Sequence, residues 1–483
     1  MDLLNVGRLH QCQAQNDSEA ARAILGTMVQ KRETLKSIKR EIAQLVENER
    51  RTEEDLVRLG VALGRHNYCF LPNEILSRVF TLLALCHGTM KFPITDVPPQ
   101  LVVSHVCSHW RRVALRTPEL WSDTHLNYPS NDPDHVISLH QRWLFRARTF
   151  PVSLSIKFDE SLGDNKIAGA LRSILLPIQV KKLTLCLTYK TFMALSTFPE
   201  AALSGLLEVE LDFLNSAGEV DVNMSDTHPL ITRLRSVAFR GPGAETWFDS
   251  LGPSLPWSQL RSLTIGVFVV DSHFILGILR EVPMLEKLSL GMRDINVSEQ
   301  LTMSSLGNLS LYVKAVNDEA DKILRTFVCP SLTEFSLAIE GNWTSETFEV
   351  LKRQYNMQEL REARFKGDFA LPVSAFLCDA PMLHSLSLGR NAIMDDEAVT
   401  GISNGTLGRF LRKLNLNVAC DVGEVLGIVE ARKNVVDGLI KNGCSWREEI
   451  TVLKDVTVHS KYKKGYKERV LALKEAGITI TFL

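Results

Sequence analysis

A repeated pattern of apolar residues runs through the chain from residue 151 onward and limits what this 483-residue protein can fold into. Each unit reads apolar-x-x-apolar-x-apolar, and successive units begin 21 to 28 residues apart. Ten units have this pattern: Val180/Leu183/Leu185, Leu206/Val209/Leu211, Leu234/Val237/Phe239, Leu260/Leu263/Ile265, Leu285/Leu288/Leu290, Leu306/Leu309/Leu311, Leu332/Phe335/Leu337, Leu360/Ala363/Phe365, Leu383/Leu386/Leu388 and Leu411/Leu414/Leu416. Such a period is typical of a chain built from stacked units.

The last two apolar positions of each unit are two residues apart, so both side chains lie on one face of a short strand. Helical stretches follow the strands, and prolines such as Pro330 and Pro381 precede the next strand. One unit cannot bury its apolar face alone, so the units must stack. The period is that of leucine-rich repeats, and residues 151–483 are predicted to form an α/β leucine-rich-repeat solenoid. Its tail from Ile450, read as strand, basic linker, helix and strand, is predicted to cap the solenoid.

The segment 17–66 is predicted to form a long helix, because it is rich in Glu, Lys, Arg and Leu and lacks proline. One heptad frame fits it, with Lys31, Glu49 and Thr52 interrupting the seam. The apolar seam residues are Ala21, Met28, Leu35, Ile42, Leu56 and Leu63 at a, and Ile24, Ile38, Leu45 and Leu59 at d. This stripe fits either self-association through residues 21–63 as a coiled coil or folding back onto the next domain.

Between residues 67 and 130 the pattern changes to short helical pieces separated by prolines. Pro72 suits the first turn of a helix, in which Ile75, Leu76 and Phe80 form part of an apolar stripe. A second helix is predicted from Gln100 to Leu115, with Val106 and Trp110 in the core, and Leu120-Trp121 folds back as an anchor. A further helix is expected within residues 131–150.

The motifs Leu71-Pro72-x-Glu74-Ile75-Leu76, Val106-Cys107-x-x-Trp110-Arg111-x-Val113-Ala114 and Pro118-x-Leu120-Trp121 occur here in order. Together they resemble the F-box-like domain of leucine-rich-repeat proteins from mushroom-type (basidiomycete) fungi. The resemblance implies a small all-α domain that binds the adaptor subunit of a cullin-type (SCF) ubiquitin ligase. The residues it places at that interface are Leu71, Pro72, Glu74, Ile75 and Leu76. Glu74 suits either a favourable position at the helix N-terminus or contact with a partner's donor.

Composition argues against several other classes of function. The chain has 55 Lys and Arg against 56 Asp and Glu, so it has no global field to hold nucleic acid or an anionic membrane. Nine scattered cysteines are typical of a reducing compartment, and neither a signal peptide nor a long apolar span is recognised. A soluble cytoplasmic and/or nuclear protein is therefore expected.

No catalytic, cofactor-binding or metal site is recognised. His105 and His109 share a helical face, but no further ligands complete a metal motif, so an ordinary helix surface is the better interpretation. The basic residues Lys461, Lys463 and Lys464 form a short isolated run, which favours a solvated loop over an RNA site.

Residues that alternate with the core leucines are the candidates for binding a protein target. They form a surface with an acidic and a more basic end, which would suit a partner of both charge signs. The candidates are Glu208, Glu210, Lys287, Glu362, Arg364, Lys413 and Asn415. The alternative is that they are ordinary solvated strand residues.

The sequence thus favours the substrate-recognition subunit of an SCF-type ligase, with adaptor and cullin as partners and no catalysis of its own. The rival hypothesis is a leucine-rich-repeat scaffold unrelated to ubiquitin, in which residues 67–130 serve as an intramolecular cap. Nucleic-acid association through the basic run is a third, disfavoured hypothesis.

Overall fold

The computed structural model describes residues 3–65, 71–128, 133–159, 162, 164–187, 203–213, 233–241, 255–266, 272–292, 299–313, 320–339, 345–367, 371–389, 392, 394–417, 421–441, 450–459 and 464–483. The chain divides into two compact units, residues 1–76 and 77–483. The helix α2 (Asn73–His87) begins in the first unit and continues in the second.

The first unit consists mainly of one helix, α1 (Leu3–Arg65), which confirms the helix predicted for residues 17–66 but begins earlier. The segment before residue 17 lacks both a heptad pattern and a proline. Once a helix is nucleated, each added residue gains one backbone hydrogen bond, so the helix extends past the end of its apolar pattern.

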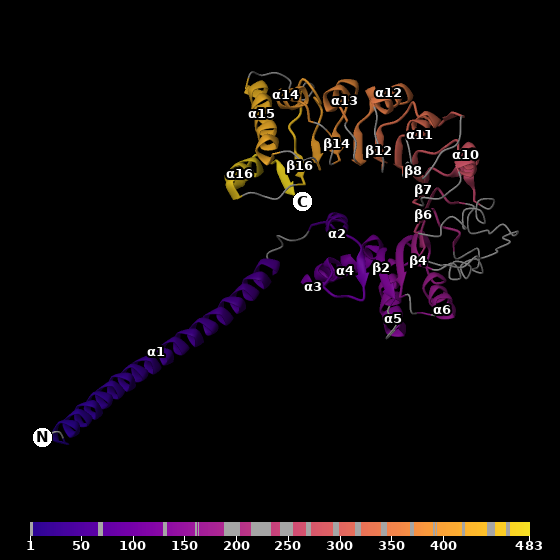
Figure 1. Cartoon of the computed structure of the whole chain (residues 1–483). Helices are drawn as coiled ribbons and strands as arrows, with labels where there is room; N and C mark the ends of the chain where they lie inside the picture. Colours follow the sequence, from indigo (N-terminus) through magenta and orange to yellow (C-terminus); the bar gives the residue numbers. More distant parts are fainter. Residues whose placement is uncertain are drawn as a thin grey trace. The chain divides into compact units, whose positions relative to one another are not determined.

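The second unit is built on one parallel sheet of fifteen strands among the described residues, in the order β1-β2-β3-β4-β5-β6-β7-β8-β10-β12-β13-β14-β15-β16-β17 (Figure 1). The strands are β1 (Met90–Phe92), β2 (Asp123–Tyr128), β3 (Val152–Phe158), β4 (Val180–Leu187), β5 (Glu208–Phe213), β6 (Ser236–Arg240), β7 (Ser262–Ile265), β8 (Lys287–Met292), β10 (Asn308–Val313), β12 (Glu334–Ile339), β13 (Glu362–Gly367), β14 (Ser385–Leu388), β15 (Lys413–Leu416), β16 (Asp455–Val458) and β17 (Thr479–Phe482). Two short strands, β9 (Leu301–Thr302) and β11 (Phe327–Val328), pair separately.

The predicted repeats supply strands β4 to β15, and the register aligns their core residues from strand to strand. Leu309, for example, lies opposite Leu288 on one side and Phe335 on the other. All the predicted apolar positions are buried except Val209, which is half-buried. Even Ala363, the smallest of them, is fully buried. The prediction of an α/β solenoid is therefore confirmed.

Helices connect the strands, and α10 to α15 lie on the outer side of the curved strand array in Figure 1. The α-helices of the second unit after α2 are α3 (Pro99–Val106), α4 (Ser108–Arg116), α5 (Pro133–Leu144), α6 (Asp164–Leu175), α10 (Ser272–Arg280), α11 (Ala320–Thr326), α12 (Ser345–Gln354), α13 (Val373–Asp379), α14 (Asp396–Asn404), α15 (Val422–Lys441) and α16 (Lys467–Glu475). Short 3-10 turns are η1 (Pro118–Trp121), η2 (Phe145–Ala147), η5 (Trp257–Gln259), η6 (Met357–Glu359) and η7 (Lys464–Tyr466).

The prediction that residues 67–130 form a small all-α domain is wrong. Strands β1 and β2 pair in parallel with each other and, through β3, with the solenoid sheet, so the sheet crosses the predicted boundary at residue 151. Strand β2 was not recognised in the sequence, because Thr124 occupies the position that is apolar in other strands. The Thr124 hydroxyl is fully buried and lies 3.0 Å from His140 Nε2, a hydrogen bond that allows a polar residue in the core.

The helix predicted from Gln100 to Leu115 is two helices, α3 and α4, separated at Cys107. Cys107 is extended, with φ −157° and ψ 170°, and its sulfur accepts the Trp110 backbone N–H at 3.4 Å. The cysteine therefore acts as the N-cap of α4. The break leaves Val106 exposed at the end of α3, although it was expected in the core. Trp121 is buried as predicted, and its Nε1 donates to the Ala114 carbonyl at 2.8 Å.

The predicted end of the solenoid is confirmed, with β16, α16 and β17 in that order. Leu453, Val456 and Val458 repeat the apolar spacing and are buried, which adds a unit that the sequence search missed. Lys461 and Lys463 lie outside the described residues. Among the helices that the structure describes, none is both long and apolar enough to cross a membrane.

Candidate functional site

Helix α2 has two apolar faces with different surroundings. Leu76 and Phe80 are each 1% exposed and belong to the core, whereas Ile75 on the neighbouring face is 49% exposed. Together with Leu71, Val79 and Leu82, Ile75 forms an exposed apolar row that we call the α2 surface. Leu76, predicted at a partner interface, is therefore a packing residue, because a helix this apolar buries only one of its faces.

The polar residues at the start of α2 are also exposed. Glu74 lies in the first turn, where its charge favours the N-terminal end of the helix dipole, and it has no ion pair with any described residue. The Pro72 carbonyl accepts the Leu76 N–H at 3.0 Å, so Pro72 begins the helical hydrogen bonding. Four of the five predicted adaptor-binding residues, Leu71, Pro72, Glu74 and Ile75, are thus accessible to a partner.

Further exposed apolar side chains follow in the next segments of the chain. They are Leu85 at the end of α2, Ile94 and Val97 between β1 and α3, and Val102 and Val106 on α3. Exposed apolar groups concentrated in one short region of sequence are typical of an interaction surface rather than of a monomer's ordinary exterior. The sequence alone did not separate these residues from the core, because both sets follow helical spacing.

All seven predicted target-binding residues lie on the strand face, the side of the sheet opposite the buried leucines. The register places Glu208, Lys287, Glu362 and Lys413 in one row across the sheet. Glu210, Arg364 and Asn415 occupy a second row, two residues further along their strands. From β5 to β15 these rows span about 40 Å at the ordinary strand spacing, so the residues cannot converge on one small ligand.

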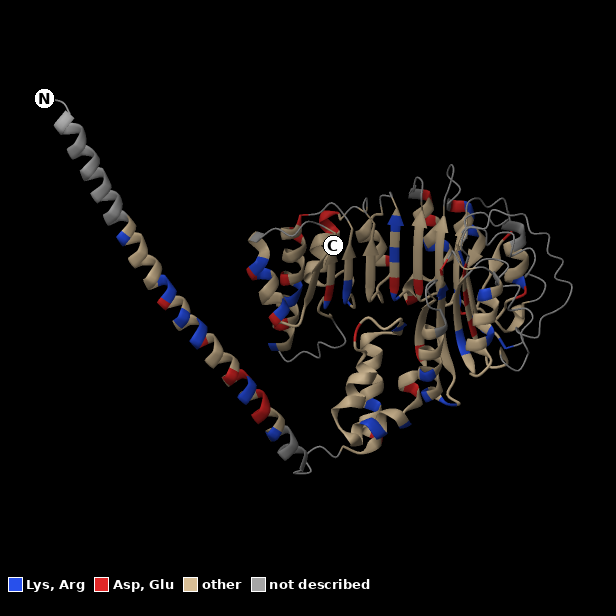
Figure 2. Ribbon diagram, turned by 90° about the horizontal axis from the view of Figure 1, so that it is seen from below, with Lys and Arg blue, Asp and Glu red and all other residues tan. Residues whose placement is uncertain are grey.

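Neighbouring residues neutralise much of the predicted acidic end of this face. Glu208 pairs with Lys182 at 3.6 Å and Glu210 with Arg240 at 3.1 Å. Glu362 and Arg364 pair with each other at 3.2 Å. Figure 2 shows charges of both signs on the strands. The prediction of separate acidic and basic ends is therefore corrected to a mixed surface with local ion pairs.

Lys287, Lys413 and Asn415 differ from the other predicted residues, because their side chains have no partner among the described residues. Lys287 makes no ion pair with any described residue. The Asn415 side-chain oxygen is buried yet accepts no hydrogen bond within the described chain. A buried acceptor without a donor is uncommon.

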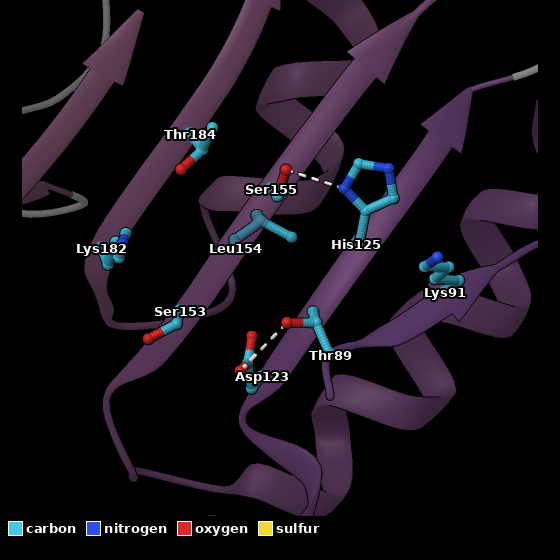
Figure 3. A pocket seen from close by; sticks show the side chains of 9 residues that line it. All are labelled: Thr89, Lys91, Asp123, His125, Ser153, Leu154, Ser155, Lys182 and Thr184. Carbon is cyan, nitrogen blue, oxygen red and sulfur yellow. Dashed lines mark hydrogen bonds between the residues drawn. The ribbon is translucent and has the colours of Figure 1, made fainter. Parts of the chain in front are cut away.

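At the β1 to β4 end, the strand face contains a polar hollow of ≈ 600 Å³ (Figure 3). Its floor alternates hydroxyl, basic and acidic groups from four adjacent strands. The lining residues are Thr89, Lys91, Asp123, His125, Ser153, Leu154, Ser155, Lys182 and Thr184. The sequence search missed this hollow because it depends on β1 and β2, which were not recognised as strands.

Hydrogen bonds orient His125 and Asp123, two of the titratable residues that line the hollow. His125 Nε2 lies 2.9 Å from the Asn127 side-chain oxygen, and its Nδ1 lies 2.8 Å from the Ser155 hydroxyl (Figure 3). Thr89 donates to Asp123 at 3.3 Å. Desolvation raises the pKa of the Asp123 carboxyl above its ordinary value, although the Thr89 hydrogen bond and the charge of Lys182 act in the opposite direction. Lys91 has no ion-pair partner among the described residues.

The Ser155-His125-Asn127 arrangement has the hydrogen-bond order of a nucleophile, a base and an orienting group. Covalent catalysis also needs donors that stabilise a developing oxyanion. Strand β3 lies between β2 and β4, and its backbone groups are committed to the parallel ladder. The geometry therefore suits the binding of a polar group better than acyl transfer.

The described residues contain no group of three or more His, Cys, Asp or Glu side chains arranged to hold a metal ion. His105 is exposed at the end of α3, and His109 lies in α4 beyond the break at Cys107. The two histidines therefore do not share the continuous helical face that the sequence predicted.

Comparison with known proteins adds little. No protein-family model matches the chain, and no curated protein matches it. Among solved structures, one similar chain comes from the crystal structure of the Rad7 and Elc1 complex in yeast, with 11% sequence identity and a TM-score of 0.33. The similarity covers 88% of this chain and 97% of that one. At this identity and TM-score, the two chains are not shown to share a function.

Proposed function

We propose that this chain is the substrate-recognition subunit of a cullin-type (SCF) ubiquitin ligase. The α2 surface and the adjoining exposed apolar residues would bind the adaptor, and the strand face would bind a protein target. The ligase's other subunits would supply the chemistry, and this chain would raise the effective concentration of target lysines near the transferred ubiquitin.

The observation that carries the proposal is the exposure of the F-box-like motif. Leu71 and Ile75 are each 49% exposed, although both are large apolar side chains. Large apolar side chains at helical spacing are well suited to the groove of a helical partner. About half of each side chain is not covered by the described chain, so contact with another protein would bury the remaining apolar surface.

The strand face supports the second half of the proposal. Its long rows of small hydroxyl and charged side chains offer many hydrogen-bond donors and acceptors spread along the sheet. Such a surface fits a polypeptide better than a small molecule, because affinity can be summed over many units. The hollow at β1 to β4 would be the most specific contact point.

The direct test is capture of the purified adaptor and cullin by the full-length chain. In the variant Leu71→Asp/Ile75→Asp we expect at least a tenfold loss of adaptor binding, because charges replace the apolar contacts. Leu471→Asp is the matched control, since Leu471 is a similarly exposed leucine on α16, far from the motif in sequence. Circular dichroism is used to check that each variant is folded. Absence of capture by the intact, folded chain overturns the proposal.

One observation favours the rival scaffold function. Strands β1 and β2 extend the solenoid sheet, which is what an N-terminal cap of a repeat array does. A cap alone requires no exposed apolar surface. If Leu71→Asp/Ile75→Asp changes no partner and instead lowers thermal stability, the cap explanation is the better one.

A further inference from the structure

The seam of α1 is an exposed apolar surface on a single helix. Its side chains at a and d are between 47% and 66% exposed. They are Ile24, Met28, Leu35, Ile38, Ile42, Leu45, Leu56 and Leu59. A helix with such a sustained a/d stripe gains its stability by packing on a partner helix.

On the opposite side of α1, charged side chains form ion pairs with one another along the helix. The ion pairs within the helix join Glu33 to Lys36, Glu47 to Arg50 and Arg51, Arg50 to Glu54, and Asp55 to Arg58. In the heptad frame all of these residues except Asp55 occupy the outer positions b, c and f. Figure 2 shows charges of both signs along this helix. The outer face therefore needs no partner, unlike the seam.

Two charged residues interrupt the seam, and they decide how a second helix can pack. Lys31 lies at d and Glu49 at a, and neither makes an ion pair with a described residue. A parallel dimer in register would place Lys31 against Lys31 and Glu49 against Glu49 in the desolvated seam. Like charges buried together are strongly unfavourable, so the parallel arrangement is disfavoured.

We propose that α1 of one copy pairs with α1 of a second copy in an antiparallel coiled coil, with Lys31 facing Glu49 of the second copy. In an antiparallel pair each a residue of one helix faces a d residue of the other. Because a two-fold axis relates the two copies, the Lys31-Glu49 ion pair forms twice. The same register also aligns apolar layers. In these layers Ile24, Leu35 and Ile38 of one copy face residues of the second copy, which are Leu56, Leu45 and Ile42 respectively.

A register shifted by one heptad is the closest competitor. It would bring Arg32 opposite Glu53 of the second copy on the exposed flank, but it would leave Lys31 facing Leu56 and Glu49 facing Ile38. In the proposed register Lys39 lies opposite Lys39 of the second copy on the flank. Glu41 likewise lies opposite Glu41 of the second copy. Flank charges are screened by solvent and contribute little, whereas unpaired charges in a dry seam are costly. The seam therefore selects the proposed register.

This arrangement would make the protein bivalent, whether or not it is a ligase subunit. The symmetry axis would cross α1 near residue 40, so the C-terminal ends of the two helices would be about 75 Å apart. The chains that follow α1 would leave from opposite ends of the coiled coil. A multivalent target could then be bound twice, which raises avidity without new contacts.

The test uses the full-length chain in an equal mixture of light and nitrogen-15-labelled protein. A carbodiimide joins amine to carboxylate without a spacer, and mass spectrometry identifies the product. We expect a Lys31-Glu49 link between light and heavy chains. Within one helix the two residues are about 27 Å apart, so this link can form only between copies. Analytical ultracentrifugation measures the dimer in parallel.

Charge reversal distinguishes the possible orientations. Lys31→Glu or Glu49→Lys should each raise the dimer dissociation constant about a hundredfold, and the double variant should restore it. Lys36→Glu is the control, because Lys36 pairs with Glu33 on the outer face. A monomeric folded chain overturns the proposal. So does a dimer that lacks the Lys31-Glu49 link or does not respond to the single reversals.

Discussion

The guanidinium of Arg432 donates through Nη2 to the backbone oxygen of Gly408 at 2.7 Å, in a fully buried part of the solenoid. Arg432 lies on α15 and reaches further backbone oxygens, of Ile402 and Arg409 before β15 and of Thr451 before β16. Arg432 forms no ion pair with any carboxylate that the structure describes, and desolvation lowers its pKa to about 10. One side chain on α15 thus connects the segment that precedes β15 with the segment that precedes β16.

We predict that Arg432→Met lowers the free energy of unfolding by about 3 kcal/mol or more, because several buried carbonyls lose their donor. Chemical denaturation of the full chain measures this loss. The control is Arg469→Met, which removes an ion pair of 2.7 Å to Glu430 at a more exposed site and should cost less than about 1 kcal/mol. Equal effects of the two variants would contradict a special role for Arg432.

The buried His140 should make stability depend on pH. Desolvation lowers the pKa of this ring from 6.5 to about 4. Between these values the unfolded state binds more protons than the folded state, so stability falls as the pH falls through this window. Below pH 4 the free energy of unfolding is lower by about 3 kcal/mol because of His140. Above pH 6.5 His140 causes no loss.

The measurement for His140 is the free energy of unfolding at several pH values, for the native chain and for His140→Gln. Other groups titrate in the same range, so the informative quantity is the difference between the two proteins. That difference should narrow as the pH is lowered from 7 to about 4. Parallel pH curves would show that His140 does not contribute.

The two faces of α2 should respond differently to truncation. Leu76→Ala creates a cavity at a residue only 1% exposed and should cost about 2 to 5 kcal/mol of stability. Ile75→Ala, at a residue 49% exposed, should change stability by no more than about 0.5 kcal/mol. Thermal or urea unfolding of both variants tests the assignment. A large loss for Ile75→Ala would place it in the core.

A side chain at Gly389 should fit only if the backbone of the adjacent strand shifts. A Cβ at this position would lie 3.0 Å from the oxygen and 3.1 Å from the nitrogen of Gly367, at the end of the adjacent strand β13. Because these are backbone atoms in a sheet, Gly389→Ala should cost about 1 to 3 kcal/mol. The control is Gly427→Ala on α15, where there is open space for a side chain. This variant should be more stable by about 1 kcal/mol, because alanine favours a helix over glycine.

Much of the architecture could be predicted from residues such as Leu309 and Leu311, because spacing of two in a repeated frame specifies a strand with one buried face. The α2 surface was predicted in part, since Leu71 and Ile75 are exposed but Leu76 is not. Helical spacing alone could not separate them, because both faces of α2 are apolar. The polar hollow was missed, because its residues Asp123 and His125 lie on a strand whose core position is a threonine.

By itself, the sequence determined the long helix, the repeat period and the strands of the repeats, because these depend on local spacing of apolar residues. Only the tertiary structure decided which residues meet across strands. It placed residues 90–128 in the solenoid sheet, formed the hollow from residues of four adjacent strands and brought Arg432 to the carbonyls of two segments. Such contacts depend on the register between distant segments and on buried hydrogen bonds, neither of which leaves a periodic signal in the sequence.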